Sequence, residues 1–262
     1  MIAFKDECKN GYPEAFISET ITDREGAVRL LPELNLIHSA ELLKLMPGAL
    51  LGGMFGTQLP KAVRALMDYK CKKRSRVPPE NVLQDKTAVF LLAVLDMLLS
   101  AAATALMIPS AAAVGICIIQ VALVCICVDR YMRIIANETV LLLFGLGLLY
   151  RVCTAGFGSL PGSFGALALV AALFGGLAAV MVKVKGDPEV GAGDIKYAMA
   201  AAAAVGWQGI VPFLACFAGA VLVYCFLGMK TAMLNRKSYF PMCLHLSVGL
   251  LGGLFLPLLG LA

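Results

Sequence analysis

The amino-acid sequence predicts an all-α protein that crosses a membrane about eight times. Of its 262 residues, 60% are hydrophobic and only 15% carry a charge, and the mean hydropathy is +0.85. A soluble domain does not need so many apolar residues to fill its core. The apolar residues also gather in windows of about 20, which is the length that an α-helix needs to cross the hydrocarbon core.

We expect transmembrane helices over eight windows, namely 47–66, 88–109, 111–128, 139–158, 160–182, 195–207, 209–229 and 240–261. The first window is the least typical, because it contains Lys61 and Arg64. The sixth is short and depends on the alanine-rich run from Ala198 to Ala204. Small side chains let helices approach closely in lipid, so this run favours a buried helix.

Residues 1–45 form a polar segment of mixed charge that precedes the predicted transmembrane domain, residues 46–262. The segment lacks the basic start and apolar core of a signal peptide. Its last part, Leu36 to Met46, has apolar residues at helical spacing. This pattern is typical of an amphipathic helix on the membrane surface or of an extension of the first span, and we favour the extension.

The lysines and arginines predict the orientation of the chain. They concentrate in the loops on one side of the predicted spans, whereas the opposite side carries only Arg151 apart from the N-terminal segment. Loops rich in Lys and Arg face the cytoplasm, so we expect a multi-pass protein of the cytoplasmic (inner) membrane with its N-terminus outside. This orientation accounts for the net charge of +5, and we expect no nucleic-acid partner.

The nine cysteines do not indicate a metal centre. Most of them lie in or beside apolar windows, no CxxC pair occurs, and neither His38 nor His245 has a neighbouring ligand pattern. Buried free cysteines behave as small hydrophobic side chains in helix packing. We therefore expect no metal and no cofactor.

Two aspartates are the candidate catalytic residues. Asp129 ends the third predicted span and Asp194 begins the sixth, and the two crossings between them return the chain to the same side. Ionisable groups at the edge of the hydrocarbon core are costly to place there and are commonly functional. Two adjacent carboxyl groups share a proton, so that one deprotonates water while the other donates a hydrogen bond to a scissile carbonyl. The alternative is that each is a loop charge, paired with Arg130 or Lys196.

The glycines that precede Asp194 favour the catalytic interpretation. Gly191 and Gly193 have no Cβ, which lets the backbone turn sharply and approach a bound chain just before a helix begins. An extended peptide can form hydrogen bonds to such a backbone.

Two stretches of sequence resemble the motifs of the type IV prepilin peptidases. Residues 129–137 read DRYMRIIAN and residues 191–209 read GAGDIKYAMAAAAAVGWQG. That family consists of GxGD membrane aspartyl proteases, which cut the leader from pilin-like precursors at the cytoplasmic membrane face. The resemblance implies a prepilin-like membrane protein as substrate and the bilayer as surroundings, with Asp129 and Asp194 catalytic. Residues implied in support of catalysis or in substrate binding are Gly191, Gly193, Lys196 and Asn137.

The chain departs from the family pattern in two places. Ala136 stands where the family has proline before the Asn or Asp, which leaves the turn after Asp129 less rigid but removes no reacting group. Many members carry paired CxxC motifs in a cytoplasmic domain after the first helix and also N-methylate the product. Here that loop is short and basic and contains one cysteine, Cys71. The resemblance is thus closest to peptidase-only members, and we do not expect methyltransferase activity.

Two other functions stay open on the sequence. An intramembrane protease of the presenilin or signal-peptide-peptidase kind shares the GxGD element but places its aspartates deeper in the helices. A proton- or cation-coupled transporter could use Asp96 with Asp129 and Asp194, although the chain has no clear internal repeat. The sequence does not identify the prepilin, its pathway or the oligomeric state.

Overall fold

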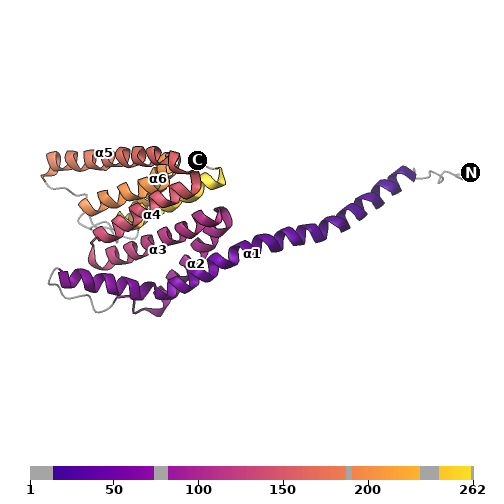
Figure 1. The fold of residues 1–262 in the computed structure, drawn as a ribbon, viewed down its shortest axis with the longest axis horizontal. Helices are drawn as coiled ribbons and strands as arrows, with labels where there is room; N and C mark the ends of the chain where they lie inside the picture. The colour runs from indigo at the N-terminus through magenta and orange to yellow at the C-terminus, as the bar shows by residue number, and fades with distance from the viewer. Residues whose placement is uncertain (1–13, 74–81, 187–190, 231–241, 261–262) are drawn as a thin grey trace, which may run out of the picture. The chain divides into compact units, whose positions relative to one another are not determined.

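The structure is a computed structural model, which describes residues 14–73, 82–186, 191–230 and 242–260. All regular elements in these ranges are helices, which confirms the predicted all-α class (Figure 1). They are α1 (Glu14–Lys73), α2 (Lys86–Leu106), α3 (Pro109–Met132), α4 (Asn137–Ala155), η1 (Phe157–Ser159), α5 (Leu160–Lys185), α6 (Ala192–Lys230), α7 (Met242–Phe255) and η2 (Leu256–Leu259).

Six helices of the described chain are long and apolar enough to cross a membrane. They cover Lys86–Leu106, Pro109–Met132, Asn137–Ala155, Phe157–Val184, Ala192–Lys230 and Met242–Leu259. The prediction of a polytopic membrane protein is confirmed, but the count of about eight spans is not. The first predicted span, 47–66, lies inside the 60-residue helix α1, which is not among the six, and α6 contains both the sixth and the seventh predicted spans.

The chain divides into two compact units, residues 1–44 and 45–262. In the first unit, residues 1–13 lie outside the described structure, and residues 14–44 belong to helix α1. The side chains are described from Leu43 onward, so an amphipathic character for residues 1–45 stays a prediction. In the second unit, Gly48, Gly52 and Gly56 lie against α2, and a Cβ at Gly56 would stand 2.7 Å from the Cα of Ala93. Small residues at this spacing let the two backbones approach closely.

Helix α6 is interrupted at Gly206, which has a non-helical backbone with φ 65° and ψ −171°. In the segment before it, residues 192–205, the Tyr197 hydroxyl is 2.7 Å from the Ser247 hydroxyl of α7. Further along both helices, Val205 packs on Gly253, where a Cβ would lie 2.6 Å from Cγ1 of Val205. The first segment of α6 therefore runs in the same direction as α7.

The segment after Gly206, residues 207–230, runs in the opposite direction along α7. Phe213 packs on Gly249, whose added Cβ would lie 2.8 Å from the Phe213 carbonyl oxygen. The ring centroids of Tyr224 and His245 are 5.0 Å apart. His245 lies one helical turn nearer the start of α7 than Gly249. The chain thus reverses at Gly206. A straight helix of the same 39 residues would be about 58 Å long, roughly twice the thickness of the hydrocarbon core.

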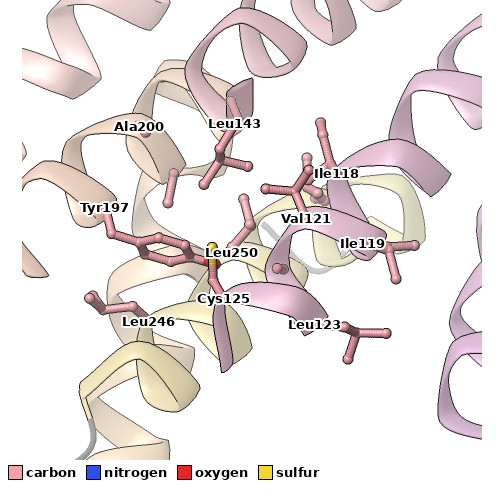
Figure 2. Packing of buried hydrophobic residues seen from close by; sticks show 14 of the residues in the cluster. Ile118, Ile119, Val121, Leu123, Cys125, Leu143, Tyr197, Ala200, Leu246 and Leu250 are labelled. Carbon is pink, nitrogen blue, oxygen red and sulfur yellow. The ribbon is translucent and has the colours of Figure 1, made fainter. Parts of the chain in front are cut away.

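The core lies where α3, α4, α6 and α7 meet. Figure 2 shows Tyr197 of α6 pointing toward Cys125 of α3, with Leu246 and Leu250 of α7 close by. The alanine run of α6 is buried, as the sequence predicted. It lets α4 approach closely, because a Cβ on Gly147 of α4 would be only 2.6 Å from the Cβ of Ala204. This core places the end of α3 beside the beginnings of α4, α6 and α7.

Candidate active site

A cavity of about 400 Å³ lies where α3 ends and where α4 and α6 begin. The residues that line it are Asp129, Arg133, Ile134, Ile135, Asn137, Gly191, Gly193, Asp194 and Lys196. All six residues that the sequence analysis singled out for the site are among them. Two motifs that are far apart in the sequence therefore meet in one place, although their catalytic and supporting roles stay predictions.

Asp129 occupies the last turn of α3 and is half-buried. The helix stops one turn later because Arg133 adopts a left-handed conformation, φ 52° and ψ 42°, which is uncommon for a residue other than glycine. The N–H of Arg133 donates to the Asp129 carbonyl oxygen over 2.9 Å and closes the helix end. The backbone N–H of Cys243, at the start of α7, donates a hydrogen bond to the Asp129 carboxyl group. Helix α7 thus helps to hold the carboxyl group in the cavity.

Asp194 lies in the first turn of α6, where its carboxyl group folds back on Gly191. The N–H groups of Asp194 and Ile195 donate to the Gly191 carbonyl oxygen over 3.0 and 3.3 Å. In return, the Gly191 N–H donates to the Asp194 carboxyl group. A Cβ on Gly191 would stand 2.8 Å from Oδ2 of Asp194, closer than real Cβ contacts. A residue without a side chain is therefore needed here for the observed position of the Asp194 carboxyl group.

Gly193 brings the first turn of α6 against the loop that follows Asp129. A Cβ on Gly193 would lie 3.2 Å from the Cβ of Ile135, so the backbone of α6 packs tightly on this loop. The approach is close enough for the negative charge of Asp129 to act on the Asp194 carboxyl group. The two carboxyl groups consequently lie within electrostatic range of each other.

Lys196 and Asn137 connect the beginnings of α6 and α4. The Lys196 ammonium group donates to Oδ1 of Asn137 over 3.4 Å, and both side chains are exposed. Beside Asn137, Glu138 forms an ion pair with Lys70 of α1. Polar contacts therefore tie three helices together at this end of the bundle.

The turn before Asn137 keeps the shape that proline would impose. Ala136 is buried and has φ −73°, within the range of proline. Its carbonyl oxygen accepts hydrogen bonds from the Thr139 hydroxyl at 2.8 Å and from the Val140 N–H at 3.1 Å. The substitution of proline by alanine in the family pattern thus leaves the turn itself in place.

An apolar groove adjoins the cavity. It has a volume of about 380 Å³ and shares Asn137 and Lys196 with the cavity. Its other lining residues come from α4, α5 and the first segment of α6, and they are Val140, Leu141, Phe144, Leu167, Met199 and Ala200. A polar cavity that is lined by two aspartates therefore adjoins an apolar surface of the transmembrane bundle.

Sequence reasoning missed two contributors to the site. The sequence analysis assigned Arg133 no role in the site, yet this residue lines the cavity; its position one helical turn after Asp129 was the available hint. Cys243 contributes a backbone N–H, which every residue except proline has, so no sequence signal could have identified it.

Asp96 does not belong to this site. It is fully buried in α2, where it accepts hydrogen bonds from Gln120 of α3 at 2.5 Å and from Ser100 at 3.2 Å. These contacts make it a packed polar group between two helices. Across the described ranges, no group of three or more His, Cys, Asp or Glu side chains is placed to hold a metal ion.

Comparison with known proteins identifies one family. Residues 116–227 match the sequence model of the Type IV leader peptidase family, a range that contains both aspartates and confirms the predicted resemblance. No curated protein and no solved structure matches the chain.

Proposed function

We propose that the protein is a membrane aspartyl endopeptidase that cleaves the leader of type IV prepilin-like precursors, which the match of residues 116–227 to the Type IV leader peptidase family supports. Asp129 and Asp194 are its catalytic pair. The observation that carries this proposal is that both carboxyl groups line one cavity and that the charge of one acts on the other.

In the proposed mechanism the two carboxyl groups hold one proton and one water molecule between them. The ionised carboxylate takes a proton from the water, whose oxygen attacks the scissile carbonyl carbon. The protonated partner donates a hydrogen bond to the carbonyl oxygen as negative charge develops there. Proton transfer to the leaving amine then breaks the peptide bond. The hydrogen bonds from the backbone N–H groups of Cys243 and Gly191 support this step, because they orient the two acids before the substrate arrives.

The apolar groove supports a membrane-embedded substrate. A prepilin-like precursor has an apolar helix beside the bond that is cut, and such a helix needs an apolar surface within the bilayer. The groove supplies one next to the aspartates, and Lys196 and Asn137 stand at the junction of groove and cavity. The cleaved bond then lies at the end of the substrate helix.

The positions of the aspartates within their helices favour cleavage at the membrane surface over cleavage inside it. Asp129 is in the last turn of α3 and Asp194 is in the first turn of α6. Arg130 and Arg133 lie one and four residues after Asp129, and positively charged ends of spans face the cytoplasm. We therefore propose a cytoplasmic active site in the inner membrane. This arrangement disfavours a protease of the presenilin kind, and the packed position of Asp96 removes the main support for a transporter.

Cleavage of a prepilin by the purified protein in liposomes tests the proposal. Asp129→Asn and Asp194→Asn should each reduce cleavage by at least about 10²-fold while the protein still inserts, because each removes one partner of the acid–base pair. Asp68→Asn is the matched control, since Asp68 is an exposed acid of α1 outside the cavity. Substantial cleavage by either active-site variant would sink the two-acid mechanism. Cleavage of a single-span signal peptide but not of the prepilin would favour the presenilin-like alternative.

A further inference from the structure

Arg151 lies at the far end of α4 from the aspartates. It is 14 residues beyond Asn137, which corresponds to about 21 Å along the helix. Its guanidinium group packs against the backbone at Gly206, where α6 reverses. A Cβ on Gly206 would be 2.8 Å from Nε and 3.1 Å from Cζ of Arg151. Arg151 is therefore a charged side chain built into the turn between the two segments of α6.

Within the described ranges, no carboxylate is paired with this charge. Arg151 is only 9% exposed, and its Nε is buried without a hydrogen-bond partner in the described part of the chain. Thr154 and Ser159 donate to the Arg151 carbonyl oxygen, which leaves the guanidinium group unaffected. A buried charge without a partner is strongly unfavourable, so charged residues inside a membrane protein normally pair with another group.

A cavity of about 240 Å³ opens beside Arg151. Its lining residues are Tyr150, Arg151, Thr154, Ala155, Val205, Gln208, Gly209, Gly253, Leu254, Pro257 and Leu258. Arg151 is the charged member of this set, and the set contains no carboxylate. The exposed amide of Gln208 adds hydrogen-bond donors at the edge of the cavity.

We propose that this cavity binds a phosphate group, which Arg151 and Gln208 hold by hydrogen bonds. The planar guanidinium fork matches two oxygens of a phosphate, and the attraction is strong where water is partly excluded. Both a phospholipid headgroup and free inorganic phosphate carry this chemistry. The surroundings suit a headgroup, because Trp207 is 59% exposed and Leu258 is 42% exposed at this end of the bundle, and tryptophan is typical of the membrane interface. This site is independent of the proposed proteolysis.

Two probes distinguish the sources of the phosphate. Delipidated full-length protein in detergent is titrated with phosphatidylglycerol in mixed micelles, or with inorganic phosphate. Thermal unfolding and native mass spectrometry report binding. Arg151→Met should weaken phosphate binding by at least about tenfold, because it removes charge-assisted hydrogen bonds while keeping an unbranched apolar stem. Lys183→Met, which removes an exposed cation of α5 outside this cavity, should leave binding unchanged.

Gln208→Leu is the second variant, because Gln208 is exposed and its replacement does not remove a buried contact. If both Arg151→Met and Gln208→Leu weaken the binding of phosphatidylglycerol, the site is a headgroup site. If the protein binds only inorganic phosphate, and both variants weaken that binding, the site is a free phosphate site. Absence of binding by either probe, or binding that the two variants leave unchanged, overturns the proposal.

Discussion

Gly191 and Asp194 are packed so closely that a Cβ on the glycine would lie 2.8 Å from Oδ2 of the aspartate. The N–H of the same glycine donates a hydrogen bond to that carboxyl group, and its carbonyl oxygen accepts hydrogen bonds from two N–H groups in the first turn of α6. A single residue thus both starts the helix and holds a proposed catalytic carboxyl group. This relationship explains in physical terms why a glycine precedes the aspartate by three positions.

Gly191→Ala should lower prepilin cleavage by about tenfold or more, because the new methyl group displaces the Asp194 carboxyl group, and small displacements of reacting groups are costly. Cleavage rates of the purified variant in liposomes measure this effect. Gly175→Ala in α5 is the control, since a Cβ there meets no atom within 4 Å. Equal loss in both variants would mean that the effect is not local to Asp194.

The double variant Asp129→Asn/Asp194→Asn should cleave scarcely more slowly than either single variant. Two groups that act as one unit lose their joint contribution when either is removed. Single-turnover cleavage rates of the two single variants and the double variant provide the measurement. Losses that multiply in the double variant would show that the two acids act independently.

Leu141→Trp should raise the KM for a membrane-embedded prepilin by about tenfold, because the indole ring fills part of the apolar groove. The kcat should change little. A short soluble peptide that spans the cleavage site but lacks the apolar helix should be cleaved at the normal rate. Leu149→Trp, an exposed position of the same helix outside the groove, serves as the control. A loss of kcat toward both substrates would place the effect in the catalytic cavity instead.

Gly206→Ala should lower the free energy of unfolding by about 1–3 kcal/mol, because an alanine at φ 65° is strained and its methyl group meets the Arg151 guanidinium. Unfolding in mixed micelles with increasing denaturant measures this change. Gly219→Ala in the second segment of α6 has free space around its Cβ and should be neutral or slightly stabilising. If both variants unfold alike, the reversal at Gly206 does not require glycine.

Hydropathy and charge were enough to predict the class of the fold and to single out the two aspartates, whose catalytic role stays a prediction. Apolar windows must be helical in lipid, because no water is present to form hydrogen bonds with the backbone N–H and C=O groups. This rule applies to each segment separately. The even number of crossings between Asp129 and Asp194 likewise follows from segment order alone. The missing Cβ atoms pointed to Gly191 and Gly193, and the family resemblance pointed to Lys196 and Asn137; all four line the cavity with the aspartates.

Other features depend on how distant segments approach one another, which no single window contains. The Cys243 N–H reaches Asp129 only because α7 packs beside α3 and α6. Arg151 entered the sequence analysis only as a charge on the side opposite the other cations. The tertiary structure places it against the reversal of α6 at Gly206, where its Nε is buried without a hydrogen-bond partner among the described residues. The sequence by itself therefore determined which residues are apolar, acidic or flexible, whereas the tertiary structure decided which of them share a cavity, because close packing between helices depends on all their side chains together.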